Sequence, residues 1–230
     1  MHSPYSLHPD LLKKIIKFIK KNNLLASVHF LESKYERKWL QKSSGRFKKF
    51  FGTFFKLQTS AMNLEYFLEK ISSLSHLLFT HNNYIEKKEF NFLLKNKSKF
   101  YATHCPVSNR ILGNKKIKFS YMKKLNTNIG TDGLSSNISL NIFDELRSAL
   151  LIYSKIKIKN LAKQLILSAT KNGAKALNIN SGEVSVGKNA DLILITLPDM
   201  CKKKDVALNT ILHTKKVSKS FIDGILVYEQ

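Results

Sequence analysis

The sequence predicts an α/β fold in which short parallel strands alternate with helices, followed by a small β appendage. Three observations carry this prediction. Short apolar runs alternate with amphipathic stretches of about 10–15 residues, which is typical of βα units around a parallel sheet. Four successive apolar runs end in a histidine or an aspartate. Beyond residue 177 the pattern changes to short strands separated by turns.

The composition is that of a folded protein with a sizeable core. The chain has 230 residues, of which 43% are hydrophobic and 24% are charged, enough for one domain or for one domain with a small partner. Only two cysteines are present, which excludes a disulfide scaffold and suits a reducing compartment. No apolar stretch approaches the roughly 20 residues of a membrane span, and the first residues lack a signal-peptide pattern. We therefore expect a cytoplasmic protein without a membrane partner.

The chain is strongly basic, with 39 lysines and arginines against 16 acidic residues and a formal net charge of +23. Such a charge is typical of proteins that bind phosphate groups. Few of these residues are arginines, however, and the lysines occur in pairs and triplets along the whole chain. Arginine rather than lysine makes forked contacts to phosphates and guanine, so we expect solvated surface and no specific nucleic-acid partner. A basic module that binds nucleic acid without specificity stays open as an alternative.

The first βα unit begins with an amphipathic helix over residues 11–19, where apolar residues share one face and lysines the opposite face. A short apolar run, residues 24–28, follows and ends in His29. The same order recurs further along the chain: helical residues 62–74 precede the run 77–80 and His81, helical residues 84–94 precede the run 100–103 and His104, and the run 126–131 ends in Asp132.

The polar residues at the ends of these runs predict a functional site. The carboxyl ends of parallel strands lie at one edge of a sheet, and in a barrel of eight βα units the catalytic groups gather there. A single histidine at a strand end is more often structural, but four polar ends in register are difficult to explain by packing. We expect His29, His81 and Asp132 to converge at one mouth, with Glu32 beside them. His104 and the following Cys105 are expected to be structural.

The remaining segments complete the expected element order. Residues 43–58 are the least regular stretch, expected to form a long loop whose aromatic side chains pack or cover the site. Further elements are predicted as helices over residues 140–153 and 160–177, strands over residues 182–188 and 191–195, and a hairpin over residues 217–228 with its turn at Asp223-Gly224. These features divide the chain into a barrel-like part, residues 1–177, and a β part, residues 178–230.

Seven short motifs occur along the chain in the order found in one enzyme family. They are residues 27–32 (SVHFLE), 79–82 (FTHN), 103–109 (THCPVSN), 129–133 (IGTDG), 135–141 (SSNISLN), 169–177 (ATKNGAKAL) and 187–192 (GKNADL). Together they resemble the amidohydrolase superfamily, in its branch of nucleoside and s-triazine deaminases and chlorohydrolases. Within that branch the sequence is similar to the aminofutalosine deaminase group, and the resemblance covers nearly the whole chain.

The resemblance implies a fold and an activity. The fold would be the C-terminal half of a (β/α)8 barrel of a metal-dependent hydrolase, about strands four to eight, followed by the C-terminal part of a β-sandwich domain. The reaction would be hydrolysis of a non-peptide C–N bond, namely deamination of an aminated purine nucleoside of the aminofutalosine type, in menaquinone biosynthesis. The cofactor would be one divalent metal ion, zinc in the first place, with iron and manganese as alternatives.

The resemblance also assigns roles to individual residues. His29 and Asp132 would bind the metal ion, and Asp132 would take a proton from the attacking water. Glu32 would carry protons between that water and the substrate, and His81 would orient and polarise the reacting centre. The substrate contacts assigned in the same way are His2, Glu32 and Ser136.

The sequence departs from the family in one respect that concerns activity. The family's metal site also uses a His-x-His pair at the end of the first strand, and this sequence contains no such pair. About 175 residues precede the β part, whereas a full barrel takes roughly 250. We therefore expect an incomplete enzyme that needs a separately encoded N-terminal segment, with a catalytically inactive remnant as the alternative. Open strand edges would also allow oligomerisation.

Overall fold

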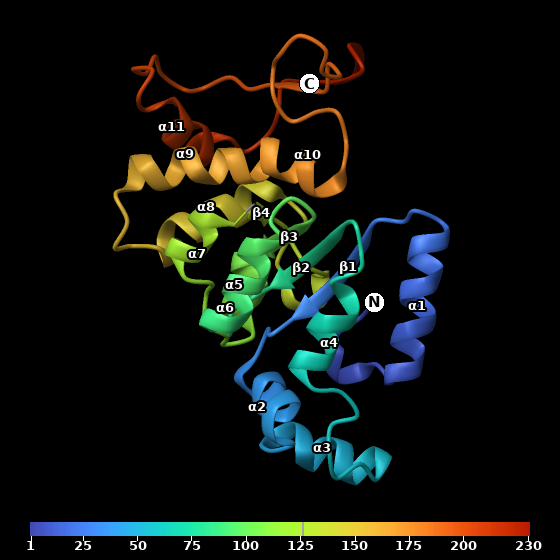
Figure 1. The fold of residues 1–230 in the computed structure, drawn as a ribbon. Coiled ribbons are helices and arrows are strands. Elements are labelled where there is room, and N and C mark those ends of the chain that lie inside the picture. The colour runs from blue at the N-terminus through green and yellow to red at the C-terminus, as the bar shows by residue number, and fades with distance from the viewer. Residues whose placement is uncertain (126) are drawn as a thin grey trace. The chain divides into compact units, whose positions relative to one another are not determined.

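The computed structural model describes residues 1–125 and 127–230. Contacts between residues divide the chain into two compact units. Figure 1 labels most of the helices and strands. The first unit comprises Met1–His104 and Leu112–Leu125. The second unit comprises Cys105–Ile111 and Asn126–Gln230. Asn126, the first residue of the predicted fourth apolar run, lies outside the described residues.

The first unit is built on three parallel strands, as far as its described residues show. These strands are β1 (Ala26–Phe30), β2 (Leu77–His81) and β3 (Phe100–His104). Phe79 at the middle of β2 pairs with Val28 on one side and Ala102 on the other. All three side chains are buried, which is typical of a parallel sheet covered on its faces. The predicted α/β class with a parallel sheet is confirmed.

The helices predicted for the first unit form close to their expected places. Residues 11–19 lie in α1 (Pro9–Lys21), residues 62–74 contain α4 (Leu64–Ile71), and residues 84–94 overlap α5 (Lys87–Lys95). Two shorter elements, η1 (Pro4–Ser6) and α7 (Phe119–Lys124), complete this unit together with the two helices described next. Each of the three predicted helices buries apolar side chains of one face, as the sequence pattern requires.

The prediction of a long loop at residues 43–58 is wrong, because most of this segment is helical. A helix α2 (Lys34–Lys42) ends at Ser43, and α3 (Arg46–Phe55) begins after Gly45. Ser43 and Gly45 have positive φ angles of 47° and 82°, which turn the chain sharply between the two helices. Phe51 of α3 stacks on Trp39 of α2 with ring centroids 5.2 Å apart, so aromatic packing stabilises a helix that the lysine-rich sequence obscured.

The second unit contains the remaining helices and a two-residue strand. Its elements up to residue 177 are α6 (Pro106–Ile111), β4 (Asn128–Ile129), η2 (Leu134–Ser136), α8 (Ile142–Ile152), α9 (Ile158–Ala169) and α10 (Lys171–Leu177). The helix predicted over residues 140–153 corresponds to α8. The single helix predicted over residues 160–177 is two helices, because Thr170 has a non-helical ψ of −92° that breaks the chain between α9 and α10.

A small antiparallel sheet ends the second unit. Its strands are β5 (Leu192–Leu194), β6 (Lys219–Ile222) and β7 (Ile225–Glu229), with β6 in the middle. Asp223 and Gly224 join β6 to β7 with φ angles of 49° and 79°, as a two-residue hairpin turn of this kind requires. The predicted hairpin is confirmed, and the strand predicted at residues 191–195 corresponds to β5.

Two other expectations for this last part are wrong. Residues 182–188 form turns rather than a strand, since Gly182 and Gly187 take positive φ angles of 86° and 83° that interrupt extended backbone. A helix, α11 (Val206–His213), was not predicted, and it buries Ile211 completely. The barrel, the β-sandwich and the boundary between residues 177 and 178 stay predictions. No helix in the described part of the chain has the length and apolar character needed to cross a membrane.

Candidate active site

The carboxyl ends of β1 and β2 bring two predicted site residues together in the first unit. His29 is the fourth residue of β1, and His81 is the last residue of β2, where it pairs with Phe30. Their imidazole rings lie with centroids 5.2 Å apart. His81 is buried and His29 is half-buried. Two neighbouring imidazoles at one sheet edge are the geometry that the strand-end pattern predicted for this unit.

The backbone at these strand ends is strained. Leu31, His81 and Asn82 have φ angles of 48°, 76° and 57°, a left-handed conformation that costs free energy for residues other than glycine. Hydrogen bonds hold the turn, because the Asn82 amide donates to the carbonyl of Phe30 at 3.0 Å. Such strain is kept where the surrounding structure fixes a functional side chain. Here it aims His81 at the edge of the sheet.

Glu32 lies directly beside His81. Its Oε2 atom is 3.8 Å from His81 Nε2, and its Oε1 atom accepts a hydrogen bond of 3.4 Å from the Asn114 side chain. The Glu32 side chain is 23% exposed, so its carboxylate is within reach of a ligand while it still faces the imidazole. Glu32 therefore stands where a group that exchanges protons at this edge has to be.

A second glutamate, which the sequence reasoning missed, holds the main chain under Glu32. Glu36 of α2 is buried and accepts hydrogen bonds from the backbone N–H groups of Leu31 at 2.9 Å and Glu32 at 2.8 Å. Burial raises the pKa of the Glu36 carboxyl to about 8, although the two backbone donors act in the opposite direction. A signal was present in the sequence, since Ser33 and Glu36 have the spacing of a capping box at a helix start.

His2 approaches His29 from the N-terminal segment. The two rings lie with centroids 5.3 Å apart, and the backbone N–H of His29 donates to the carbonyl of His2 at 2.8 Å. The Nδ1 atom of His2 lies 2.8 Å from Ser6 Oγ, which orients the ring. Burial, followed by the nearby His29, lowers the pKa of the His2 imidazole. His2 thus belongs to the same group of side chains as His29, His81 and Glu32.

His104 at the end of β3 is completely buried. Burial is the main cause that lowers the pKa of its imidazole to about 3, with the nearby His81 and Lys116 as further causes. A histidine with such a pKa stays neutral at physiological pH. The adjacent Cys105 is buried as well, so neither side chain is presented to a ligand.

In the second unit, Asp132 follows β4 and is held by hydroxyl groups. Its Oδ2 atom accepts hydrogen bonds from Ser108 Oγ at 2.6 Å and Ser136 Oγ at 3.2 Å, and its Oδ1 atom accepts from the backbone N–H of Gly133 at 2.9 Å. Asp132 has a left-handed φ of 61°. Ser136, expected at the substrate, therefore supports Asp132. Ser108 was not singled out, although it lies within the motif at residues 103–109.

Another buried glutamate supports the surroundings of Asp132. Glu145 of α8 accepts hydrogen bonds from the backbone N–H of Val107 at 3.0 Å and from the Asn137 side-chain amide. The same Asn137 amide also donates to the carbonyl of Thr131, the residue before Asp132. Burial raises the pKa of the Glu145 carboxyl. Side chains, rather than consecutive backbone amides, thus hold this loop.

The predicted site residues therefore form one group in each unit. The first unit holds His2, His29, Glu32 and His81, and the second holds Asp132 with its two serines. The donor set of His29, His81 and Asp132, two imidazoles and one carboxylate, is chemically suited to a divalent ion such as zinc, iron or manganese. Glu32 lies beside His81 in the first of these groups.

Comparison with known proteins gives a consistent result. The chain is 42% identical over 225 residues to an aminodeoxyfutalosine deaminase of Nitratiruptor sp., and 34% identical over 229 residues to an adenosine deaminase of Helicobacter pylori. Both alignments span 97% of this chain, but they span only 55% of the first relative and 56% of the second. The crystal structure of Helicobacter pylori aminofutalosine deaminase in complex with methylthio-coformycin matches with a TM-score of 0.91 at 35% identity. That match covers 99% of this chain and 56% of the crystallised one.

The chain thus spans about half the length of the relatives that it matches. Within that span the correspondence is continuous, since the pattern that defines the amidohydrolase family matches residues 1–227. The ordered motifs, the parallel α/β unit and the strand-end histidines agree with this match. The chain belongs to the amidohydrolase family.

Proposed function

We propose that this protein is a metal-dependent hydrolase that removes the amino group of an aminated purine nucleoside, of the aminodeoxyfutalosine type used in menaquinone biosynthesis. One observation carries the proposal. The Glu32 carboxylate lies 3.8 Å from the buried His81 imidazole, and His81 lies beside His29 at the same sheet edge. The names of two relatives, an aminodeoxyfutalosine deaminase and an adenosine deaminase, support an aminated purine nucleoside as the substrate. The cytoplasm is the proposed compartment.

We propose that His29 and Asp132 hold the metal ion, and that His81, whose ring lies beside that of His29, serves the reacting centre. A divalent ion, when bound, supplies the Lewis acidity that allows water to ionise near neutral pH. The serine hydroxyls that donate to Asp132 Oδ2 fix the orientation of this carboxylate, as groups behind a metal ligand commonly do. Zinc is the proposed ion, because imidazole and carboxylate oxygen are both among its ordinary ligands.

The residues of this chain would divide the proton transfers among them. Hydrolytic deamination forms a C–O bond between water and the ring carbon and breaks the C–N bond, so that ammonia leaves. Glu32 would take one proton from the attacking water and deliver it to the ring nitrogen. Asp132 would take the second water proton, which would then pass to the departing amine so that it leaves as ammonia, and His81 would hydrogen-bond to the oxygen at the reacting carbon. His2 and Ser136 would contact the substrate.

We propose that turnover also needs residues that this chain does not contain. His29 and Asp132 supply two protein ligands, and the family's His-x-His pair is absent from the sequence. A partner segment carrying that pair would complete the metal site, as three protein ligands and an open position are usual for catalytic zinc. The chain by itself should therefore bind zinc weakly and release little ammonia.

The experiment combines this chain with the part of the Nitratiruptor relative that it does not match. Ammonia release is measured with aminodeoxyfutalosine and with adenosine, and metal content is measured in the same sample. The reconstituted protein should deaminate one of these nucleosides, and Glu32→Gln should keep the metal while losing at least a hundredfold in turnover. Glu65→Gln is the matched control, because Glu65 is an exposed carboxylate that forms an ion pair with Lys88 on the surface. A metal-loaded protein that deaminates neither nucleoside, or a Glu32→Gln variant with full activity, would contradict the proposal.

A further inference from the structure

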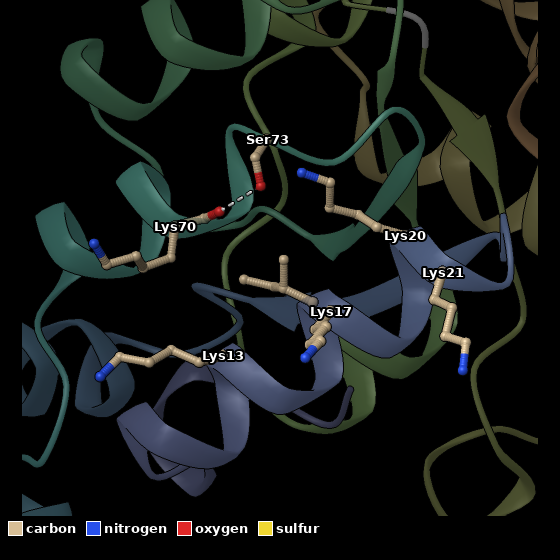
Figure 2. Close-up of a pocket in the computed structure, with 7 residues that line it drawn as sticks. Lys13, Lys17, Lys20, Lys21, Lys70 and Ser73 are labelled. Atoms are coloured by element: carbon tan, nitrogen blue, oxygen red, sulfur yellow. Dashed lines mark hydrogen bonds between the residues drawn. The ribbon is translucent and has the colours of Figure 1, made fainter.

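A groove lined by lysines lies between α1 and α4 on the first unit, and Figure 2 shows the side chains around it. Its volume is about 590 Å³. Five lysines line it, four from α1 and one from α4, with an apolar side chain of α1 between them: Lys13, Lys17, Lys20, Lys21, Lys70 and Ile16. No acidic side chain lines it. The groove is therefore a concentrated positive surface within a molecule that is already basic.

The amphipathic pattern of α1 creates this surface. Leu12, Ile16 and Ile19 are buried, and Ile16 forms the apolar floor where the buried face meets the groove. Lys13 and Lys17 lie four residues apart, and so do Lys17 and Lys21, so like charges occupy neighbouring positions on one helix surface. Such pairs destabilise a helix slightly. An anion bound in the groove would attract these lysines and offset their mutual repulsion.

Only part of this charge is neutralised within the protein. Asp10 lies 3.1 Å from Lys13, and Glu69 lies 2.7 Å from Lys70. The other three lysines make no ion pair with any residue that the structure describes. In Figure 2 one of these three, Lys20, extends from α1 toward the turn that carries Ser73. The groove thus presents three uncompensated ammonium groups, with a neutralised lysine at its edge on each helix.

An ordinary role for lysines at helix ends accounts for only some of these residues. Lys20, Lys21 and Lys70 lie in the last turns of α1 and α4, where cations stabilise the helix dipole. Lys13 and Lys17 lie in the first and middle turns of α1, where a cation has no such benefit. The dipole also does not explain why lysines from two helices line the same groove. A ligand with several negative groups explains both features.

The side chains that line the groove indicate which class of anionic ligand fits it. Lysines without arginine offer mobile point charges rather than a forked contact to one planar anion, and none of the lining residues is aromatic, the nearby Tyr66 ring being covered by Lys70. The seven steps from Lys13 to Lys20 rise about 10 Å along the helix, at about 1.5 Å each. About three phosphates of one nucleic-acid strand fit that length, at roughly 3.4 Å per phosphate. A single phosphate ion would meet only a part of the groove.

We propose that this groove binds the phosphate backbone of a nucleic acid without reading its sequence. The groove lies apart from the strand ends that carry His29 and His81. Lys20, Lys21 and Lys70 belong to helix ends that lead into the amino ends of β1 and β2, opposite to the ends with the histidines. Binding at the groove therefore does not depend on the proposed deaminase activity. Phosphate binding at this groove accounts for the high lysine content of α1.

The experiment measures binding of the full chain to a fluorescent 24-base-pair DNA duplex of arbitrary sequence by fluorescence anisotropy, over a series of salt concentrations. The test variant is the triple substitution Lys17→Gln, Lys20→Gln and Lys21→Gln, which removes the three uncompensated lysines. The matched control replaces three exposed lysines outside the groove, Lys87, Lys123 and Lys124, by glutamine. Both variants carry the same net charge, so a difference between them reports the position of the charge.

The test variant should bind the duplex at least tenfold more weakly at 50 mM salt than the unaltered chain, and the control within threefold. The salt dependence should become shallower only in the test variant, by about 2 to 3 in the logarithmic slope, because about three phosphate contacts are lost. Duplexes of different sequence should bind equally. Equal losses in the two variants would overturn the proposal. So would binding that is restricted to inorganic tripolyphosphate or to vesicles of phosphatidylserine and phosphatidylcholine.

Discussion

Two buried glutamates, one in each unit, hold the loops that carry the site residues, and they do so in different ways. Glu36 accepts from two consecutive backbone N–H groups, the second of which belongs to Glu32. Glu145 accepts from one backbone N–H, that of Val107, and from the side-chain amide of Asn137. The first unit therefore fixes its loop through rigid main-chain donors. The second unit relies partly on a side chain that is able to rotate.

The difference matches what each site residue has to do. The Glu32 carboxylate accepts a long hydrogen bond of 3.4 Å from Asn114 and lies 3.8 Å from the His81 imidazole, an arrangement that suits proton exchange. The Asp132 carboxylate accepts three hydrogen bonds, two of them from serine hydroxyls, and its orientation is fixed. A metal ligand benefits from carboxylate oxygens in a fixed orientation. A proton carrier benefits from a fixed backbone and a carboxylate that can exchange its hydrogen-bond partners.

The largest expected effect that distinguishes the two glutamates is the pH dependence of stability. The pKa of Glu36 is raised from 4.5 to about 8 in the folded chain, so the folded state keeps a proton that the unfolded state releases above pH 4.5. Stability is therefore lost as pH rises from about 4.5 to about 8, at a slope of at most about 1.4 kcal/mol per pH unit. Glu36→Gln should flatten this slope between pH 6.5 and 8.

Urea denaturation followed by tryptophan fluorescence measures this slope for the first unit. Trp39 is the single tryptophan of the chain and is buried in α2, next to the segment that Glu36 holds. His104 is present in both proteins, so its contribution to the pH dependence cancels in the difference between the unaltered chain and Glu36→Gln. Glu145→Gln is the control and should leave the Trp39 transition unchanged. Equal slopes in the unaltered chain and Glu36→Gln would refute the raised pKa of Glu36.

A smaller effect is expected when each glutamate is replaced and the local opening of its loop is followed by amide hydrogen exchange at pH 6. The side-chain oxygen of a glutamine at position 36 can accept from a backbone N–H but its NH2 group cannot, so one of the amides of Leu31 and Glu32 loses its partner. Exchange at that position should accelerate about tenfold, since an unsatisfied buried donor costs about 1–3 kcal/mol. Glu145→Gln should accelerate the Val107 amide threefold or less, because the new amide can turn toward Asn137. Equal acceleration in both variants would contradict the conclusion that the two glutamates hold their loops in different ways.

Metal affinity gives the next effect, and it concerns the second unit. Ser108→Ala removes the 2.6 Å hydrogen bond to Asp132 Oδ2 and leaves the 3.2 Å hydrogen bond from Ser136 on that oxygen and the Gly133 N–H on Oδ1. The affinity of the chain for zinc, measured by competition with a chromophoric chelator, should fall about tenfold. Ser139→Ala is the control, since the Ser139 hydroxyl donates to Asp144 rather than to Asp132. An unchanged zinc affinity in Ser108→Ala would contradict the role of Asp132 as a metal ligand that Ser108 orients.

Much of the fold could be predicted because it depends on local pattern. The apolar runs that end in His29, His81 and His104 mark β1, β2 and β3, and the hairpin turn at residues 223–224 has the residue types that positive φ angles require. The helix α3 escaped prediction because its stability depends on packing against another helix, through the stacking of Phe51 on Trp39. Propensity and periodicity carry no information about such a contact.

The supporting residues of the site were hidden for a similar reason. Ser108 and Asp132 are 24 positions apart, and Val107 and Glu145 are 38 positions apart, so neither pair is visible before the chain has folded. Glu36 is the exception, because it acts within six residues and follows a serine at the capping-box spacing. The strand-end residues were found because each stands at the end of an apolar run, whereas their supports stand on other elements.

The smallest effect is expected at Asn114, and it tests whether Glu32 really is held by its backbone. The Asn114 amide is 3.4 Å from Glu32 Oε1, near the limit of a hydrogen bond, whereas the main chain of Glu32 donates to Glu36 at 2.8 Å and accepts from the Asn83 side chain at 3.1 Å. Asn114→Ala should therefore change ammonia release by the reconstituted enzyme less than twofold and leave exchange of the Glu32 amide unaltered. Asn137→Ala, the corresponding change in the second unit, removes a side chain that does hold a loop and should accelerate exchange there severalfold. A tenfold loss of activity in Asn114→Ala would mean that side-chain contacts position Glu32, and the two units would then hold their site residues in the same way.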